Sequence, residues 1–389
     1  MEEISSEKVC VCALNRIFGF KPTIARGLIN TFGSACAVFR TDHESIRRLI
    51  GPFNGVDQMI NIQAIENAKE ELEKISRMGY DFICINDPDY PALLKECEDP
   101  PIGLYISSIS PPSDIFNTRP SIAIVGTRDI SPYGREWCRR IVGAIAHAEI
   151  KPLIVSGLAL GTDITAQAQA LDCGLPTLSV MATGIETLYP HQNRHIGETI
   201  ERTPGCALIT DYPTGTVPMA FNFLRRNRII AGMSSATILV ESKAQGGGMM
   251  TARLAFSYER DVYALPGRVD DIRSQGCNQL IMEKIAEPIT DLDELVDKLG
   301  LKAARKGKAS DILKDVEAKY KGHIPDGNLD DLLDILQLIK NNRGITLDEL
   351  CNKSEKPYST IAECTGMLES DGVISIDLIQ RCTINLKIV

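Results

Sequence analysis

Residues 121–126 read SIAIVG, and apolar runs of this kind, rich in β-branched residues, occur six times in the centre of the chain. The other five are PLIVSG (152–157), PTLSVMA (176–182), CALITD (206–211), ATILVES (236–242) and DVYALPG (261–267). Each run is followed by a longer segment compatible with a helix. Continuous apolar strands that alternate with helices predict a mostly parallel sheet with helices on both faces. We therefore expect an α/β fold with an extended, doubly wound Rossmann-like domain over residues 80–298, whose ligands bind at the carboxyl ends of the strands.

The patterns on either side of this domain are weaker. Residues 1–79 read as short helices, two of them joined by a glycine turn as in a helix-hairpin-helix or SAM-like unit. Such units either contact nucleic-acid backbones or act as packing modules, and the acidic surroundings favour packing. Residues 299–328 are polar and poorly periodic, which predicts a linker. Residues 329–389 predict three helices and a hairpin, the elements of a winged-helix-like domain.

Composition narrows the classes of protein to consider. The chain has 389 residues with a formal net charge of -9, and its 12 cysteines form no CxxC pair. This pattern favours reduced thiols, with neither a disulfide framework nor a metal site. The acidic, polar start is unlike a signal peptide, and no apolar run has the length of a membrane span. We therefore expect a cytoplasmic protein without metal or cofactor.

Charge is distributed unevenly along the chain. Residues 1–118 hold 11 Lys and Arg against 17 Asp and Glu, and residues 291–389 hold 14 against 18. Residues 119–290 hold 17 against 16, so an anionic partner is expected there. In the predicted winged helix, residues 354–371 carry one Lys against four acids. That balance disfavours contact with duplex DNA and leaves a protein contact or a packing role.

Glycine and small polar residues collect where the predicted strands end. Glycine lets backbone amides approach an anion, and a helix N-terminus adds a partial positive charge. The stretch FNFLRRNRIIAG, residues 221–232, adds three arginines before an apolar run. Together these features predict a phosphate-type site. The motifs GxxxxGK[ST], GxSxG and HExxH are missing, and no complete GxGxxG follows the first strand. Asp163 and Glu241 are candidate bases, but binding explains the site more economically than catalysis.

Several strings in order resemble the DNA-processing protein A family, also called DprA or Smf. They include IAIVGTRDISPYG, VSGLALGTD, GIETLYPHQN, FNFLRRNRIIAGMS, VESKAQGGGMMTARLAF and VYALPGRVDDIRSQGCNQLI. The resemblance covers about residues 80–290 closely and the flanks by architecture. It implies an extended Rossmann fold that binds single-stranded DNA, forms homodimers and loads the recombinase RecA during natural transformation, without catalytic turnover.

The resemblance also implies the residues that bind DNA. Phe223 could stack on a base, and the arginines and Asn227 could contact successive phosphates, although some arginines, Arg228 above all, could instead pair with acids inside the fold. The chain departs from the family pattern at two positions, with Leu160 in place of a basic residue and Gln167 in place of a histidine. These departures affect the expected affinity for DNA more than the binding mode. The full set is Gly126, Thr127, Arg128, Ser156, Gly157, Gly161, Phe223, Arg225, Arg226, Asn227, Arg228, Gly247, Gly248 and Thr251.

Two further expectations complete the sequence reading. The stretch MMTARLAFSY has apolar residues at helical spacing, and with the family resemblance it suggests a homodimer contact through Met250, Leu254, Phe256 and Leu280. The same face could be ordinary core. The alternative function is a phosphoribohydrolase-type enzyme that acts on nucleotides, because related Rossmann-like folds carry PGGxGTxxE. This chain reads GGGMMTAR, with Arg253 where an acid is expected.

Overall fold

The computed structural model describes residues 6–51, 55–301, 312–322, 324–342, 344–377 and 379–384. The chain divides into two compact units, residues 1–303 and 304–389. We describe each unit by itself. The predicted domain boundaries at 79/80 and 298/299 stay predictions.

The larger unit is built on a nine-stranded sheet in the order β1-β2-β6-β5-β4-β3-β7-β8-β9. The strands are β1 (Asp81–Cys84), β2 (Gly103–Ser107), β3 (Ser121–Val125), β4 (Leu153–Ser156), β5 (Thr177–Val180), β6 (Ala207–Thr210), β7 (Ala236–Leu239), β8 (Asp261–Ala264) and β9 (Glu287–Pro288). All neighbours from β6 to β9 pair in parallel, whereas β1 and β2 are antiparallel to each other and β2 is antiparallel to β6. The six predicted strands and the doubly wound parallel sheet are confirmed.

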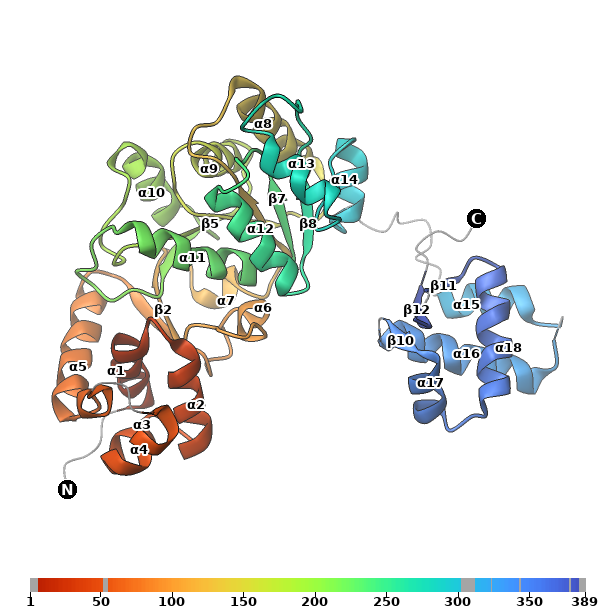
Figure 1. Ribbon diagram of the computed structural model, residues 1–389, viewed down its shortest axis with the longest axis horizontal. Coiled ribbons are helices and arrows are strands. Elements are labelled where there is room, and N and C mark those ends of the chain that lie inside the picture. The colour runs from red at the N-terminus through yellow and green to blue at the C-terminus, as the bar shows by residue number, and fades with distance from the viewer. Residues whose placement is uncertain are drawn as a thin grey trace. The chain divides into compact units, whose positions relative to one another are not determined.

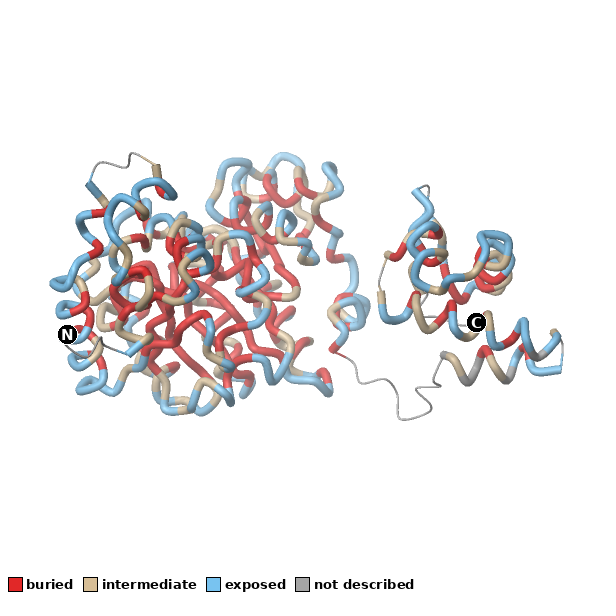
Figure 2. The backbone as a smooth tube through the Cα atoms, turned by 90° about the horizontal axis from the view of Figure 1, so that it is seen from below, coloured by how far each residue is buried: buried red, intermediate tan, exposed pale blue. Residues whose placement is uncertain are grey.

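Two hydrophobic cores cover the two faces of this sheet (Figures 1 and 2). Alternation along β3 shows the division, because Ile122 and Ile124 belong to one core and Ala123 and Val125 to the other. The first core includes α8 (Pro132–His147), α9 (Thr162–Asp172) and α14 (Leu292–Lys298). The second includes α10 (Arg194–Glu201), α11 (Ala220–Met233), α12 (Gly247–Ser257) and α13 (Gln275–Met282).

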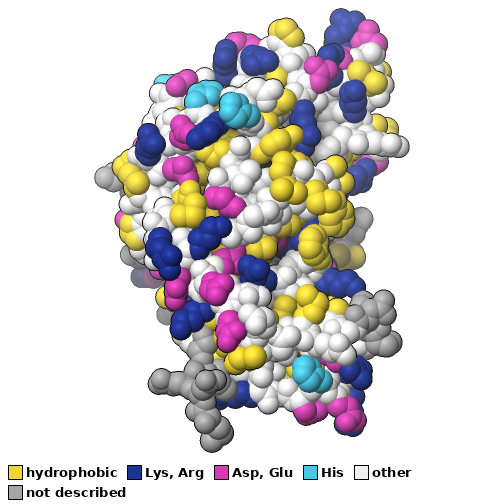
Figure 3. Space-filling model, turned by 90° about the vertical axis from the view of Figure 1, so that its left-hand side faces the viewer, with side chains coloured by type: hydrophobic (Ala, Val, Ile, Leu, Met, Phe, Trp, Pro, Cys, Tyr) yellow, Lys and Arg dark blue, Asp and Glu magenta, His cyan; other side chains and the backbone are white. Residues whose placement is uncertain are grey.

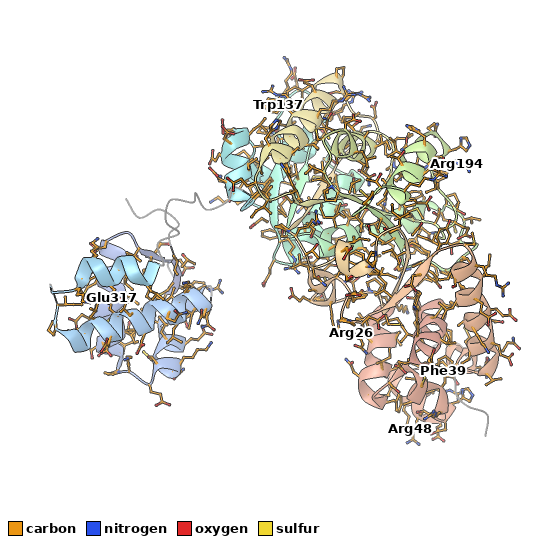
Figure 4. The ribbon with its side chains drawn as sticks, turned by 180° about the vertical axis from the view of Figure 1, so that it is seen from behind. Arg26, Phe39, Arg48, Trp137, Arg194 and Glu317 are labelled. Atoms are coloured by element: carbon orange, nitrogen blue, oxygen red, sulfur yellow. The ribbon has the colours of Figure 1, made fainter. Side chains whose placement is uncertain are left out.

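The N-terminal helices share the second core instead of forming a separate one. They are α1 (Glu7–Phe18), α2 (Pro22–Phe32), α3 (Ala35–Arg40), α4 (His43–Ile50) and α5 (Ile62–Arg77). Helix α1 packs against β1 and β2, and buried Asn15 donates an Nδ2–H bond to the Asp211 carbonyl oxygen at 3.0 Å. Figure 4 shows Arg26 and Phe39 in this helical part and Trp137 of α8 at the far end of the unit.

The C-terminal unit has its own core and a three-stranded sheet in the order β10-β12-β11. Its elements are α15 (Ile312–Tyr320), α16 (Asp326–Asn341), β10 (Ile345–Thr346), α17 (Leu347–Ser354), α18 (Tyr358–Ser370), β11 (Ile374–Ile376) and β12 (Arg381–Ile384). The predicted three helices and hairpin of a winged helix are present. Helix α17 begins with a capping box, because Thr346 and Glu349 exchange hydrogen bonds with each other's backbone N–H groups.

The linker prediction for residues 299–328 needs correction. Helix α15 lies inside that range, and its Val316 and Tyr320 are buried in the core of the C-terminal unit. Charged residues hid its apolar positions from the periodicity argument. Residues 302–311 of the predicted linker and residues 385–389 of the predicted hairpin lie outside the described residues. Among the helices that the structure describes, none is both long and apolar enough to cross a bilayer.

Candidate functional site

A cavity of about 500 Å³ opens at the carboxyl ends of β3 and β7, which are neighbours in the sheet. Strand order reverses between these two strands, because β3 is followed in sequence by β4 on one side and β7 lies on the other. Such a switch point is where doubly wound folds bind ligands. The cavity is lined by the loop after β3 (residues 125–129), the loop after β7 (Ser242, Lys243, 246–248) and the first half of α11 (Ala220, Phe223, Leu224, Arg226, Asn227). Ala159, Asp163, Ile230 and Thr251 complete the lining.

Glycine is required where the two loops meet. A Cβ on Gly126 would lie 2.4 Å from Thr162 Oγ1, and a Cβ on Gly248 would lie 3.0 Å from Gly126 Cα. Gly161 has φ +79°, and its Cβ would lie 2.3 Å from the Thr127 carbonyl oxygen. The predicted Gly126, Gly161 and Gly248 therefore set the close approach of the backbones that line the cavity.

An exposed cation and an aromatic ring lie together at the cavity. The Arg128 guanidinium lies 4.8 Å from the centroid of Phe223, and the centroid of the Tyr189 ring lies 5.7 Å from that of Phe223. Arg128 is exposed and Phe223 half-buried. Lys243 is a second exposed cation on the cavity wall. The N-terminus of α12, which begins at exposed Gly247, adds backbone N–H groups and a partial positive charge.

Arg226 lines the same cavity, but it is buried and has a structural role. Its Nη1 donates to the Gly157 carbonyl oxygen at 2.8 Å and also to the carbonyl of Val180. It thus ties the carboxyl end of β5 to the loop after β4. Burial lowers the pKa of Arg226 to about 10, which leaves it charged at neutral pH. We correct its predicted role accordingly, because a buried guanidinium held by two carbonyls does not reach a phosphate.

Arg225 and Arg228 point to Asp211, at the end of β6. Arg228 Nη2 donates to Asp211 Oδ2 at 2.6 Å, and Arg228 also bonds the carbonyl of Asp99. Arg225 Nη2 lies 3.6 Å from the same Asp211 oxygen, and its side chain is only 9% exposed. Asp211 and Arg228 are both buried. The prediction that Arg225 and Arg228 contact phosphates is corrected by this ion-pair network.

The remaining predicted site residues divide between the cavity and the core. Thr127 and Gly247 border the cavity, and Asn227 Nδ2 reaches the Gly247 carbonyl oxygen at 3.5 Å. Ser156 is fully buried, where its hydroxyl donates to the Ile124 carbonyl, so its predicted contact with DNA is corrected to a strand-pairing role. Gly157 lies against the Arg226 guanidinium, 2.2 Å from where its Cβ would be. Buried Thr251 donates to the Gly247 carbonyl at 3.2 Å, within the first turn of α12.

The two candidate bases are both engaged with backbone N–H groups. Asp163 accepts from Gly157 N–H at 3.1 Å, and burial raises its pKa. Glu241 accepts from Ser131 N–H at 2.9 Å and from the Ser131 hydroxyl, beside the N-terminus of α8. Arg253 pairs with Glu283 at 2.8 Å on the surface. These contacts give each group a structural role, so no observation favours the nucleotide-hydrolase alternative.

The four predicted dimer residues lie in different environments. Met250 and Phe256 are exposed on α12, and Leu254 is half-buried against the core. Leu280 on α13 is fully buried. Its predicted interface role is therefore corrected, because a side chain inside the core of one chain is closed to a second chain.

Sequence reasoning missed several residues of this face. Lys243 has no neighbouring cation, so no charge pattern marked it. Phe221 and Leu224 on α11 and Val217 and Met219 before it are exposed, as is Phe20 after α1. Figure 3, which faces the side that carries α10 and the start of α11, shows hydrophobic side chains gathered across its middle. Contiguous exposed apolar patches are typical of interaction surfaces.

Comparison with known proteins gives two family matches. Residues 81–300 match the model of DNA recombination-mediator protein A, and residues 332–375 match that of a winged helix-turn-helix DNA-binding domain. The first match spans the whole sheet, including the cavity described above.

Individual relatives agree with the first match. The chain is 34% identical over 277 residues to protein Smf of Synechocystis, which covers 71% of this chain and 64% of that protein. It is 35% identical over 199 residues to DNA processing protein DprA of Streptococcus pneumoniae, which covers 51% of this chain and 67% of that one. The chain therefore spans about two thirds of the length of these relatives.

Two solved structures are similar in fold and in sequence. The crystal structure of the Streptococcus pneumoniae DprA superposes with a TM-score of 0.63 at 26% identity, over 74% of this chain and 95% of that one. A DNA processing protein A from Helicobacter pylori, whose single-stranded DNA binding mode has been described, gives a TM-score of 0.50 at 28% identity. That match covers 57% of this chain and 95% of that one.

Proposed function

The chain belongs to the DNA recombination-mediator protein A family, and we propose that it binds single-stranded DNA, without sequence specificity, at the cavity between β3 and β7. The observation that carries the proposal is the pairing of exposed Arg128 with the Phe223 ring at the rim of a glycine-lined cavity. A strand without a partner offers both phosphates and unstacked bases, and this site offers a cation for the first and a ring for the second.

The electrostatics of the site are compatible with a phosphate backbone. Arg128 and Lys243 are the exposed cations among the described residues of the cavity wall, and the α12 N-terminus lies beside them. No protein atom lies within 4 Å of where a Cβ on Gly247 would be, so a phosphate can approach the start of α12 closely. We infer that bases stack on Phe223, a contact that tolerates every base.

The cellular role follows from the family by analogy. We propose that the bound strand is protected and handed to the recombinase RecA, in the cytoplasm, during natural transformation or recombination. In this scheme the protein is a homodimer and carries out no catalytic turnover. A pull-down of RecA by the full chain, with and without a bound strand, tests the handover separately from DNA binding.

We predict tighter binding to single strands than to duplex DNA, with a modest dependence on salt. Two exposed cations, Arg128 and Lys243, neutralise about two phosphates, so the logarithm of the association constant falls against the logarithm of the salt concentration with a slope of roughly -1.4. If Arg225, Arg226 and Arg228 also neutralised phosphates, the slope would be steeper. Fluorescence anisotropy with a labelled oligothymidylate and a duplex of equal length, across a salt series, measures both quantities. Equal or tighter binding of the duplex, or a flat salt response, contradicts the proposed function.

We also predict a homodimer that uses the exposed residues of α12. Phe256→Glu or Met250→Glu places a carboxylate without a partner in the contact, which costs about 3 kcal/mol and raises the dimer dissociation constant by about 150-fold. Light scattering of the wild type should give twice the 42.7 kDa of one chain, and both variants should approach the single-chain value. Ile109→Glu is the control, because Ile109 is exposed after β2 at the opposite edge of the sheet. A monomeric wild type refutes the dimer, and a dimer indifferent to both variants refutes its location.

A further inference from the structure

Two exposed phenylalanines from distant parts of the chain lie against each other beside the cavity. Phe20 lies between α1 and α2 and is 62% exposed, and Phe221 lies in the first turn of α11 and is 59% exposed. Their ring centroids are 6.2 Å apart at an interplanar angle of 29°, a stacked arrangement. We call this pair the aromatic platform.

The platform is held from behind by a cation and a third ring. The Arg225 guanidinium lies 4.7 Å from the Phe20 centroid and 5.6 Å from that of Tyr212. Tyr212 contacts Phe20 edge to face at 6.5 Å, and its hydroxyl donates to the Asn222 carbonyl at 3.3 Å. Because Asp211 fixes Arg225 and Tyr212 is buried, the rings have a rigid support. Their exposed faces are thus positioned before any ligand arrives.

The platform continues the surface of the cavity. Ala220, Phe223 and Leu224 of α11 line the cavity, and exposed Phe221 lies three residues before Leu224, a spacing that makes these two side chains neighbours on the helix surface. A strand that leaves Phe223 can therefore pass over the N-terminal end of α11, where Met219 makes no side-chain cap. The free N–H groups of a helix start favour a phosphate. The path then reaches Phe221 and Phe20.

We propose that Phe20 and Phe221 form a second base-stacking site, which extends the bound single strand onto the N-terminal helices. This inference rests on the proposed function and adds a subsite to it. The occupant is an unpaired base. The two rings offer exposed faces on which a base can stack, and Arg225 supports them from behind. The platform also adjoins the cavity that receives the strand. Aromatic rings stack on any of the bases, so the contact does not depend on the sequence of the strand. The N-terminal helices thus contribute a contact to DNA besides their packing role.

The test compares strands that reach the platform with strands that do not. Oligothymidylates of about 4 to 20 nucleotides, the range of single-strand site sizes, are titrated into wild type, Phe20→Ala and Phe221→Ala. Loss of one stacked base corresponds to about 5- to 150-fold weaker binding, so we expect that loss with the long strands and wild-type affinity with the shortest. Phe20→Trp should retain the affinity, because indole also stacks. Ile109→Ala is the control for removal of an exposed apolar side chain at the other edge of the sheet.

A second arm removes the bases and keeps the phosphates. The long strand is made with consecutive abasic sites in the part that extends beyond the cavity, and the effects of Phe20→Ala and Phe221→Ala should disappear on it. Equal affinities of wild type and both variants for the intact long strand overturn the platform while the proposed function stands. Absence of any binding by the wild type overturns both. A change in molar mass of the Phe20 variant in light scattering, with DNA affinity unchanged, identifies a contact between chains and also overturns it.

Discussion

Replacement of Asp211 by alanine lowers the free energy of unfolding of the larger unit by about 3–5 kcal/mol, the cost of breaking a buried ion pair from one side. Asp211 is buried, accepts from Arg228 at 2.6 Å and lies 3.6 Å from Arg225. Alanine leaves the largely buried Arg225 without its carboxylate partner and leaves Arg228 with Asp99 alone, at 3.8 Å. The backbone carbonyl of Asp211 also accepts from Asn15, so the network joins the N-terminal helices to the sheet.

The fluorescence of a single tryptophan can report the unfolding of the larger unit. The chain contains one tryptophan, Trp137, which lies half-buried on α8 and packs against a core of the larger unit. Tryptophan fluorescence during urea denaturation therefore reports on that unit alone, without interference from the C-terminal one. Glu198→Ala is the matched control, since it also removes one carboxylate from an arginine pair. That pair, Arg194–Glu198, is exposed at 2.8 Å, and its loss costs at most about 0.5 kcal/mol.

A double variant separates loss of charge from loss of packing. Arg228→Met in the Asp211→Ala background removes the stranded charge and keeps an apolar stem, so it should recover part of the stability. Equal stability of Asp211→Ala and Glu198→Ala would contradict the assignment of Asp211 as the buried counter-charge. A double variant that is less stable than Asp211→Ala would show that Arg228 contributes through Asp99 instead.

The sheet and the place of the cavity were predictable because both depend on local pattern. Strands such as SIAIVG are buried on both faces, so they read as unbroken apolar runs. Once the strands are parallel, glycine loops at their carboxyl ends must meet at one edge, and Gly126 and Gly248 do so. The shared core of the N-terminal helices with the sheet was not predictable, since helical periodicity shows which face is buried and not against what.

The arginines of α11 show what spacing alone leaves out. Each helical residue turns by about 100°, so Arg225 and Arg228 point away from Phe223 while Asn227 points to the same side. Their partner Asp211 directly follows β6. Arg228 also bonds the carbonyl of Asp99, which is 129 positions away in the sequence. The three arginines therefore occupy two environments, since Arg225 and Arg228 share Asp211 and Arg226 is held by two carbonyls. The open alternative, that some arginines pair with acids inside the fold, is the one that the structure shows for Arg225 and Arg228.

Arg128→Ala should weaken binding of single-stranded DNA by about 10- to 150-fold, which corresponds to about 1.5–3 kcal/mol for a hydrogen bond to a charged group. Arg128 is exposed at the cavity and lies over the ring of Phe223, so it combines a charge for a phosphate with a support for the stacking residue. Because its side chain is on the surface, thermal unfolding should be unchanged. Arg128→Lys retains the charge and loses the planar stack, so its affinity should fall between those of wild type and alanine variant.

Arg225→Ala gives the contrast that makes this prediction specific. Arg225 is nearly buried and paired with Asp211, so its replacement should lower thermal stability, in contrast to Arg128. Arg119→Ala is the matched control for charge, because Arg119 is exposed just before β3, at the amino edge of the sheet. Anisotropy titrations at fixed salt, with melting curves of the same samples, measure both effects. If Arg128→Ala binds as tightly as Arg119→Ala, the strand does not enter this cavity, and the site lies elsewhere on the chain.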